Sequence, residues 1–483
     1  INNQEFNFGI YEIELLIDNK LIYKLNFDQY NFEQDYLVYK ELDYYLINKY
    51  SKKYHRLFKN DGVNLDFVDN RSIQGINLNQ EYHNLIINIS DINNNKIQVQ
   101  GVLKGDLIVN NQLEFDRINS NIFSEKGFDE LILNYSTRYN NSKSFPISYQ
   151  KIDSQNVVLH IPEEPYEILE YYRKNNSGLK SKTNYIDLIK YDPLKIHGEI
   201  DIKHLEKGVV IEFTENIFSG YNANAIIKYN NKEQFKIDLY RKEKNVLSSK
   251  ILMPKEFKDI KEIDIKYKSY PEKVFKKSIN GDYIDSRSYA IIEFDNFIIT
   301  SSTESLYEDI FLSIEDVNII IDKKYDIIST PIKISPTSIP FRNDIELLYE
   351  NLKIDTNHCA IYSYNEKKNK WNFMKKLNYN NYINKHKIRT KIYSGGTFAV
   401  LRELIKPTIS NISPASTATY KSEDLKQIAF NVVDKQSGIN SNSIRVKIDE
   451  RNIFCEYIPY RDFVRCNIEP LTKDYHNFEI SIE

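Results

Sequence analysis

Two polar residues near the middle of the chain have the types and spacing that could bind a metal ion. A His and an Asp four residues apart, such as His197 and Asp201, can both bind zinc when a loop brings them together, and a His-x-His pair would complete the site. However, Ile200 and Ile202 alternate with His197, Glu199 and Asp201, which predicts the exposed face of a strand. Strand geometry separates side chains four residues apart by ~13 Å, and none of the eight histidines belongs to a His-x-His pair. We therefore predict neither a metal ligand nor a catalytic residue in this chain.

Other polar positions favour structural roles over chemical ones. The acids near Asp434 could hold calcium in a loop, but the spacing Asp-x-x-Ser-Gly is more typical of a plain turn. His55 lies among aromatic residues, which favours a packed, hydrogen-bonded histidine over a ligand. Glu163 and Glu164 indicate a solvated loop, because nothing fixes another carboxylate near them. Exposed tyrosines could stack on sugars or partners, although a sandwich core would bury most of them.

The cysteines near the C-terminal end allow one cross-strand disulfide. Residues 454–467 predict a hairpin, and its register pairs the opposite charges of Glu456 and Arg465. The same register places Cys455 opposite Cys466, at a Cα separation of ~4.5–5.5 Å that a disulfide accepts. An exported protein would form this bond in an oxidising compartment. Two reduced, half-buried cysteines are the alternative, and the third cysteine is expected to be a small core residue.

The composition excludes a general attraction to nucleic acid or anionic lipid, because 65 basic and 68 acidic residues nearly cancel. No window approaches the ~20 apolar residues of a transmembrane segment. The chain begins at Ile1 rather than Met, directly before strand-like sequence. We therefore expect a fragment whose N-terminal part, with any export signal, lies upstream.

The elements that must position these residues are strands. Apolar residues alternate with polar ones along most of the chain, which predicts an all-β string of β-sandwich, immunoglobulin-like modules. At 483 residues the chain allows three or more domains with separate cores. Residues 1–112 are predicted as a first β-sandwich that opens with a hairpin at residues 11–27. Helical spacing of apolar residues predicts a short helical insertion in it at about 36–50.

Four further segments follow the first module. Residues 113–192 are predicted as an irregular β and loop region, because prolines interrupt short strand candidates. Residues 193–283 have the strand spacing of an immunoglobulin-like sandwich. Residues 284–404 are predicted as a β domain closed by the Phe398 strand. A proline linker then leads into a C-terminal immunoglobulin-like module at 405–483, which we expect to be truncated. The strands vary too much to assign a sequence repeat.

Several short motifs, taken together and in order along nearly the whole chain, resemble one protein family. The motifs are residues 9–15, 54–58, 395–402, 407–409 and 437–439. With them the chain resembles the long β-rich region that follows the catalytic domain in bacterial secreted zinc metallopeptidases of the lysostaphin/LytM type, the peptidoglycan endopeptidases. In that family a His and an Asp four residues apart and a His of a His-x-His pair hold the zinc. The resemblance therefore places the catalytic domain and its zinc upstream of Ile1, and His197 and Asp201 match only part of the ligand spacing.

The resemblance implies a non-catalytic accessory or targeting region of a cell-envelope peptidase homologue. Such a region would lie in the periplasm or outside the cell, with peptidoglycan or an envelope protein as its partner. The parent protein would hydrolyse peptide bonds with a zinc-activated water. The alternative is an adhesive or scaffolding surface protein of immunoglobulin-like modules with no enzymatic role, and a third hypothesis, a carbohydrate-binding accessory, would need a planar aromatic strip. A zinc-ligand set in the upstream sequence would decide between the first two.

Overall fold

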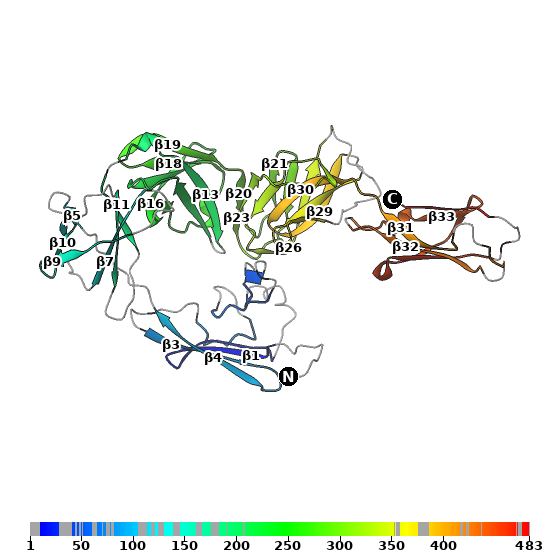
Figure 1. Cartoon of the computed structure of the whole chain (residues 1–483), viewed down its shortest axis with the longest axis horizontal. Helices are drawn as coiled ribbons and strands as arrows, with labels where there is room; N and C mark the ends of the chain where they lie inside the picture. Colours follow the sequence, from blue (N-terminus) through cyan, green and yellow to red (C-terminus); the bar gives the residue numbers. More distant parts are fainter. Residues whose placement is uncertain are drawn as a thin grey trace. The chain divides into compact units, whose positions relative to one another are not determined.

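A computed structural model of the chain is all-β and built from antiparallel sheets (Figure 1). The chain divides into two compact units: the first comprises Ile1–Ser286, Leu306–Ser313 and Pro336–Arg342, and the second comprises Arg287–Ser305, Ile314–Ser335 and Asn343–Glu483. Among the described residues, no helix is long and apolar enough to cross a membrane. The structure describes every residue except 1–9, 29–40, 44–45, 48–49, 51, 60–64, 70, 74–77, 79–81, 105–113, 117–120, 124–129, 139–144, 161–166, 175–182, 190, 206–207, 352, 354–357, 375–385, 416–418, 422–424, 436, 470, 472–475 and 483.

The first sheet begins with the predicted hairpin and has the strand order β2-β1-β3-β4. Because every second residue of β1 is apolar, Ile13, Leu15 and Ile17 face one side and are buried against Tyr23 and Leu25 of β2. Figure 1 shows β1, β3 and β4 side by side. The strand bounds are β1 (Glu12–Ile17), β2 (Lys20–Asn26), β3 (Tyr82–Ser90) and β4 (Lys96–Lys104).

The helical insertion expected at about 36–50 lies largely outside the described residues. Within that range Leu46, Ile47 and Tyr50 have helical backbone. The backbone N–H of Ile47 donates to the carbonyl of Asp43 at 2.9 Å, and the N–H of Leu46 donates to the side chain of Asp43 at 2.9 Å. The described residues therefore have helical hydrogen bonding to Asp43, as expected of a helix N-terminus.

The second segment is more regular than the irregular β and loop region predicted for 113–192. It holds two four-stranded sheets, ordered β5-β6-β10-β9 and β12-β11-β7-β8. Leu131, Leu133, Tyr135, Val157 and Leu169 form its core. Several of its strands are only two to four residues long, too short for an alternating pattern to stand out in the sequence. The strands are β5 (Glu114–Asp116), β6 (Asn121–Phe123), β7 (Glu130–Ser136), β8 (Phe145–Pro146), β9 (Tyr149–Lys151), β10 (Asn156–Leu159), β11 (Ile168–Lys174) and β12 (Asn184–Asp187).

The third segment is a seven-stranded sheet ordered β13-β14-β17-β16-β15-β18-β19. Its core includes Ile211, Phe213, Ala225, Ile263 and Ile265, all fully buried. The predicted strands near Ile200, Val209, Ala225 and Phe235 are confirmed as β13 to β16. The elements are η2 (Pro193–Lys195), β13 (Gly198–Leu205), β14 (Gly208–Glu215), β15 (Ala223–Tyr229), β16 (Gln234–Glu243), β17 (Val246–Ser248), η3 (Pro254–Phe257), β18 (Ile260–Tyr267) and β19 (Tyr270–Ser278).

The next strands include the predicted Phe398 strand, which is β30. Its neighbours are β25 and β27, β28 follows β27, and β24 also pairs with β30. A second sheet has the order β21-β22-β26-β29, and β20 pairs with β23. The strands are β20 (Gly281–Ile284), β21 (Ala290–Phe294), β22 (Phe297–Ser301), β23 (Ile310–Asp316), β24 (Tyr325–Ile327), β25 (Ile332–Ser335), β26 (Pro340–Glu350), β27 (Cys359–Asn365), β28 (Lys370–Phe373), β29 (Lys387–Ser394) and β30 (Gly396–Glu403).

The C-terminal module packs a four-stranded sheet, β31-β32-β36-β35, and a three-stranded sheet, β34-β33-β37, around one core. Phe430 of β32, Val446 of β33 and Val464 of β36 are almost completely buried in that core. The elements are β31 (Thr408–Ser413), β32 (Gln427–Val433), η4 (Ser441–Ser443), β33 (Arg445–Ile448), β34 (Arg451–Ile453), β35 (Glu456–Ile458), η5 (Pro459–Arg461), β36 (Phe463–Asn467) and β37 (Phe478–Ser481).

Candidate functional site

A buried arginine connects the second segment to the seven-stranded sheet. Arg138 follows β7 and is 1% exposed. Its Nη1 donates to the carbonyl of Phe218 at 3.0 Å, and the N–H of Phe218 donates back to the Arg138 carbonyl at 3.0 Å. Its Nη2 lies 2.5 Å from Asp187 and its Nε 3.3 Å from Glu167. Because a guanidinium presents its donors in a rigid planar fork, these partners favour one placement of the Phe218 loop.

A second arginine holds the same loop from the side of the seven-stranded sheet. Glu215, at the end of β14, is fully buried, and Arg241 Nη1 donates to its Oε2 at 2.8 Å. The hydroxyl of Tyr267 donates to Oε1 at 2.7 Å, and the hydroxyl of Ser219 donates to the same oxygen. The guanidinium of Arg241 also lies over the ring of Phe218, 4.7 Å from its centre. We call Arg138, Arg241 and the partners named for them the arginine joint.

Gly220 shows how closely the two segments approach at the arginine joint. It has a φ of 71°, and a Cβ built on it would lie 2.8 Å from Cβ and Oδ2 of Asp187. Only glycine fits this position without strain or displacement. Sequence reasoning missed the joint, because Arg138 and Asp187 are 49 residues apart and neither belongs to a local pattern. The sole sequence signal was an isolated Ser-Gly turn at 219–220.

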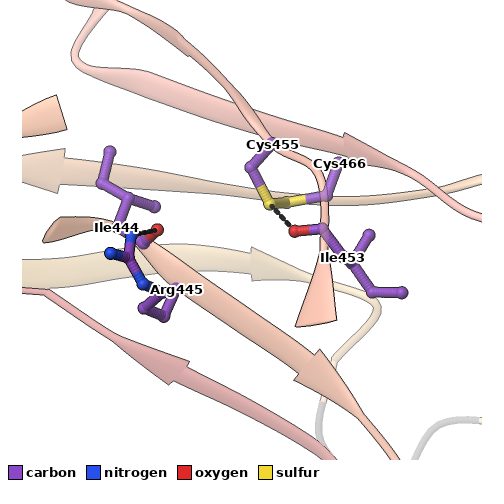
Figure 2. The surroundings of a disulfide bond; sticks show 5 residues. All are labelled: Ile444, Arg445, Ile453, Cys455 and Cys466. Carbon is purple, nitrogen blue, oxygen red and sulfur yellow. Dashed lines mark hydrogen bonds between the residues drawn. A yellow bond between two sulfur atoms is a disulfide. The ribbon is translucent and has the colours of Figure 1, made fainter. Parts of the chain in front are cut away.

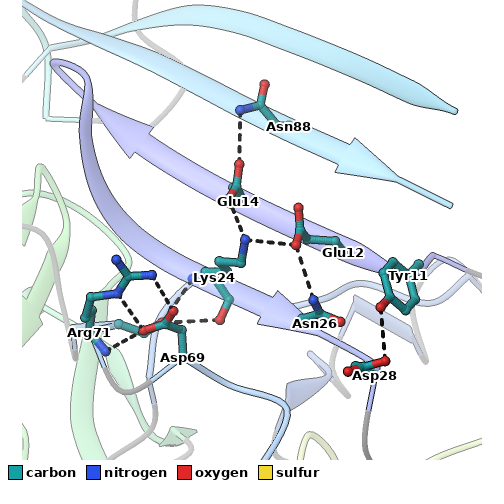
Figure 3. A network of polar contacts seen from close by, with 10 residues as sticks. Tyr11, Glu12, Glu14, Lys24, Asn26, Asp28, Asp69, Arg71 and Asn88 are labelled. Carbon is teal, nitrogen blue, oxygen red and sulfur yellow. Dashed lines mark hydrogen bonds and ion pairs between the residues drawn. The ribbon is translucent and has the colours of Figure 1, made fainter. Parts of the chain in front are cut away.

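The polar face of the first sheet carries a connected network (Figure 3). Lys24 Nζ lies 2.8 Å from both Glu12 Oε2 and Glu14 Oε1, and Asn88 extends the network to β3. The hydrogen bond from Lys24 holds the pKa of Glu14 below its usual value. Each carboxylate therefore already has a partner of opposite charge, and the network stabilises the pairing of β1 with β2 rather than presenting a free acid or base.

Beside this network, Arg71 and Asp69 form an exposed pair. Arg71 Nη2 donates to Asp69 Oδ2 at 2.7 Å, and the backbone N–H of Arg71 donates to Oδ1 at 2.8 Å (Figure 3). Hydrogen bonds from Arg71 lower the pKa of Asp69 to about 2. The Arg71 side chain is 73% exposed. This pair thus offers an exposed counterpart to the buried pairs of Arg138.

The structure does not bring the zinc-like residues of the sequence together. His197 is exposed, and its backbone N–H donates to Asn216 Oδ1 at 2.9 Å. Asp201 lies on β13 opposite Glu212 and forms an ion pair with Lys203. Within the described part of the chain, no group of three or more His, Cys, Asp or Glu residues could hold a metal ion.

The other described candidate residues make turn or packing contacts. The hydroxyl of Ser437 donates to Asp434 Oδ2 at 3.3 Å, as in a side-chain-capped turn. His55 packs edge-on against Phe27, and its burial lowers its pKa. Its Nδ1 has no hydrogen-bond partner in the described residues. Glu163 and Glu164 lie outside the described residues.

Cys455 and Cys466 form a disulfide in the structure (Figure 2). Their Cα atoms are 4.1 Å apart. The adjoining register is the predicted one, since Glu456 lies opposite Arg465 in the pairing of β35 with β36. Cys359 is buried and is not part of a disulfide.

No family model and no curated protein matches this chain. Among solved structures, S. aureus TarS is 12% identical, covers 54% of this chain and 41% of its own, and has a TM-score of 0.16. The plexin A4 extracellular region is 8% identical, with coverages of 80% and 43% and a TM-score of 0.14. The Bacteroides ovatus mixed-linkage glucan utilization locus protein SGBP-B, in complex with a mixed-linkage heptasaccharide, is 10% identical, with coverages of 81% and 82% and a TM-score of 0.13. This chain thus spans less than half of the TarS chain, and TM-scores this low support no functional assignment.

Proposed function

We propose that this chain is the non-catalytic accessory region of a cell-envelope zinc metallopeptidase homologue, built of immunoglobulin-like modules. In this proposal it holds, spaces or targets an upstream catalytic domain against peptidoglycan or an envelope partner. The motif resemblance supplies the peptidase family. The zinc and its ligands belong to the upstream domain in this proposal.

The arginine joint is the observation that most supports a spacing role. A spacer must keep consecutive modules in one arrangement, and a joint made only of surface loops would not do so. Here Arg138 is buried between Asp187 of its own segment and the Phe218 carbonyl of the next. Separating the two segments would break the hydrogen bonds between Arg138 and Phe218 and expose the buried guanidinium, while Asp187 and Glu167 stay with Arg138.

The disulfide supports an extracytoplasmic location. Structural disulfides persist in the periplasm and outside the cell and are rare in the cytosol. The bond joins Cys455, just before β35, to Cys466 of β36. A protein that works on the cell envelope would meet this oxidising environment.

Co-sedimentation of the purified chain with purified peptidoglycan sacculi tests the proposal. We expect the chain to pellet with sacculi, to release no soluble fragments when zinc is added, and to contain no stoichiometric zinc by elemental analysis. Release of soluble fragments, or one zinc per chain that is lost in a His197→Ala variant, would contradict a non-catalytic role. A chain that stays in the supernatant would contradict direct peptidoglycan binding and favour the adhesive or scaffolding alternative.

A further inference from the structure

Two hairpins at opposite ends of the sequence turn in the same way. The hairpin β1–β2 turns at Asp18 and Asn19, and the hairpin β33–β34 turns at Asp449 and Glu450. The φ angles are 49° and 63° in the first and 45° and 69° in the second. Two central residues with positive φ define the type I′ turn, whose twist matches that of the flanking strands.

Each hairpin is also paired with a return strand, and the sequence at or just before the start of that strand is the same in both cases. In the first module β3 pairs with β1, and in the last module β37 pairs with β33. The tripeptide Tyr-His-Asn occurs at 82–84 and again at 475–477, just before alternating apolar residues. The variation among the other strands conceals this repeat in the sequence.

Three contacts between the turn and the return strand are the same in both modules. His83 Nδ1 lies 2.6 Å from Asp18 Oδ2, and the N–H of Asn84 donates to Asp18 Oδ1 at 2.8 Å. The N–H of Asp18 donates to the carbonyl of Asn84 at 2.9 Å. Because an ionised carboxylate only accepts hydrogen bonds, His83 Nδ1 carries the hydrogen.

The second set repeats these contacts atom for atom. His476 Nδ1 lies 2.5 Å from Asp449 Oδ2, and the N–H of Asn477 donates to Asp449 Oδ1 at 3.0 Å. The N–H of Asp449 donates to the carbonyl of Asn477 at 2.9 Å. The imidazole side chains are 11% and 15% exposed and their carboxylate partners 50% and 41%. In both cases a mostly buried ring thus holds a half-exposed carboxylate.

We propose that this Asp–His–Asn clasp is one repeated device that fixes a hairpin to its return strand, and that the first and last modules share it as a common building unit. His83 and His476 are positioning residues in this account, since each orients the aspartate that closes the turn. Each clasp acts only within its own module. The inference does not depend on the proposed envelope function.

Hydrogen exchange on the full chain tests the clasp. A His83→Leu variant should exchange the amides of Asp18 and Asn84 about tenfold faster or more, because a charge-assisted hydrogen bond is lost. The amides of Asp449 and Asn477 should be unchanged. A His476→Leu variant should show the reverse pattern.

Conservative variants separate loss of the hydrogen bond from general loss of packing. In His83→Asn and His476→Asn, the side-chain amide can occupy the place of Nδ1 and keep a donor, so exchange should stay within about twofold of the parent chain. A His197→Gln variant, at an exposed position, should change neither turn. Unchanged exchange in the Leu variants, equal loss in the Asn variants, or a response of both modules to one substitution would overturn the proposal.

Discussion

Glu41 is a carboxyl group in an unusual setting, because it is 3% exposed and accepts a hydrogen bond from the hydroxyl of Tyr23. Burial raises its pKa from 4.5 to about 7, although the hydrogen bond from Tyr23 and the charge of Arg56 act in the opposite direction. Between these two pH values the folded chain binds more protons at Glu41 than the unfolded chain does. Folding stability therefore falls as pH rises from about 4.5 to 7 and levels off above this window.

We predict that Glu41→Gln removes this pH dependence. At pH 8 the variant should be more stable than the parent by up to ~3 kcal/mol, since a pKa change from 4.5 to about 7 has that value. At pH 4 the two should be nearly equal. Urea unfolding followed by hydrogen exchange in β1 to β3 measures the difference. Equal pH dependence in both proteins would show that Glu41 is not the titrating group.

Arg138 and Arg71 form a matched pair for testing how much a buried arginine contributes. Arg138→Met leaves Asp187 and the Phe218 carbonyl without their partner in a buried site, so we predict a loss of about 3 kcal/mol in unfolding free energy. Arg71→Met breaks an exposed pair with Asp69 and should cost much less, because solvent screens an exposed ion pair. Denaturant titration of both variants measures the two losses of unfolding free energy. Similar losses would contradict the prediction that the arginine joint stabilises the fold.

At the scale of the element, the sequence predicted strands well wherever they are long and alternate. The hairpin at residues 11–27 and the strand near Phe235 each bury one face, and the Phe398 strand is a continuous apolar run buried on both faces. Between 114 and 159, the short strand candidates correspond to β7 and β10, whereas β5, β6, β8 and β9 were not predicted because each has only two or three residues. The arginine joint and the clasps were not predictable from local patterns, since their partners come together only through tertiary packing.

Alanine substitutions at Gly220 and Gly438 distinguish the cost of backbone strain from the cost of close packing. Both have positive φ, 71° and 81°, so an alanine at either position costs about 1 kcal/mol. A Cβ at Gly438 meets nothing within 4 Å, whereas one at Gly220 meets Asp187, which Arg138 holds in place. We predict that Gly220→Ala loses about 2 kcal/mol more than Gly438→Ala. Unfolding of each variant measures this difference, and equal losses would argue against a tight approach of the two segments.

The hairpin β35–β36 gives a prediction that depends on export. Thiol titration of unfolded, unreduced protein made by secretion should find one free thiol per chain, Cys359, because Cys455 and Cys466 are joined. Reduction should raise the count to three and destabilise the C-terminal module by roughly 2–3 kcal/mol. Three thiols before reduction would refute the disulfide in the exported protein.

At the scale of the whole molecule, the chain is all-β and built from many antiparallel sheets, and several of its described charged groups are paired within it. An acidic side chain lies close to each arginine of the joint, to Lys24 of the first sheet and to each histidine of the clasps. The proposal of an attached peptidase domain comes from the sequence resemblance, because neither the strand order nor the arginine joint identifies such a domain.

The most direct test of the proposal takes the protein with the upstream catalytic domain that we propose and compares it with a version that lacks residues 1–483. Both would be assayed on intact peptidoglycan sacculi and on a short soluble cell-wall peptide. We predict that removing the region lowers the release of fragments from sacculi about tenfold or more, because tethering raises the local concentration of the catalytic domain. Cleavage of the soluble peptide should be unchanged. Equal activity of the two proteins on sacculi, or a parent that cleaves neither substrate, would contradict the proposed accessory role.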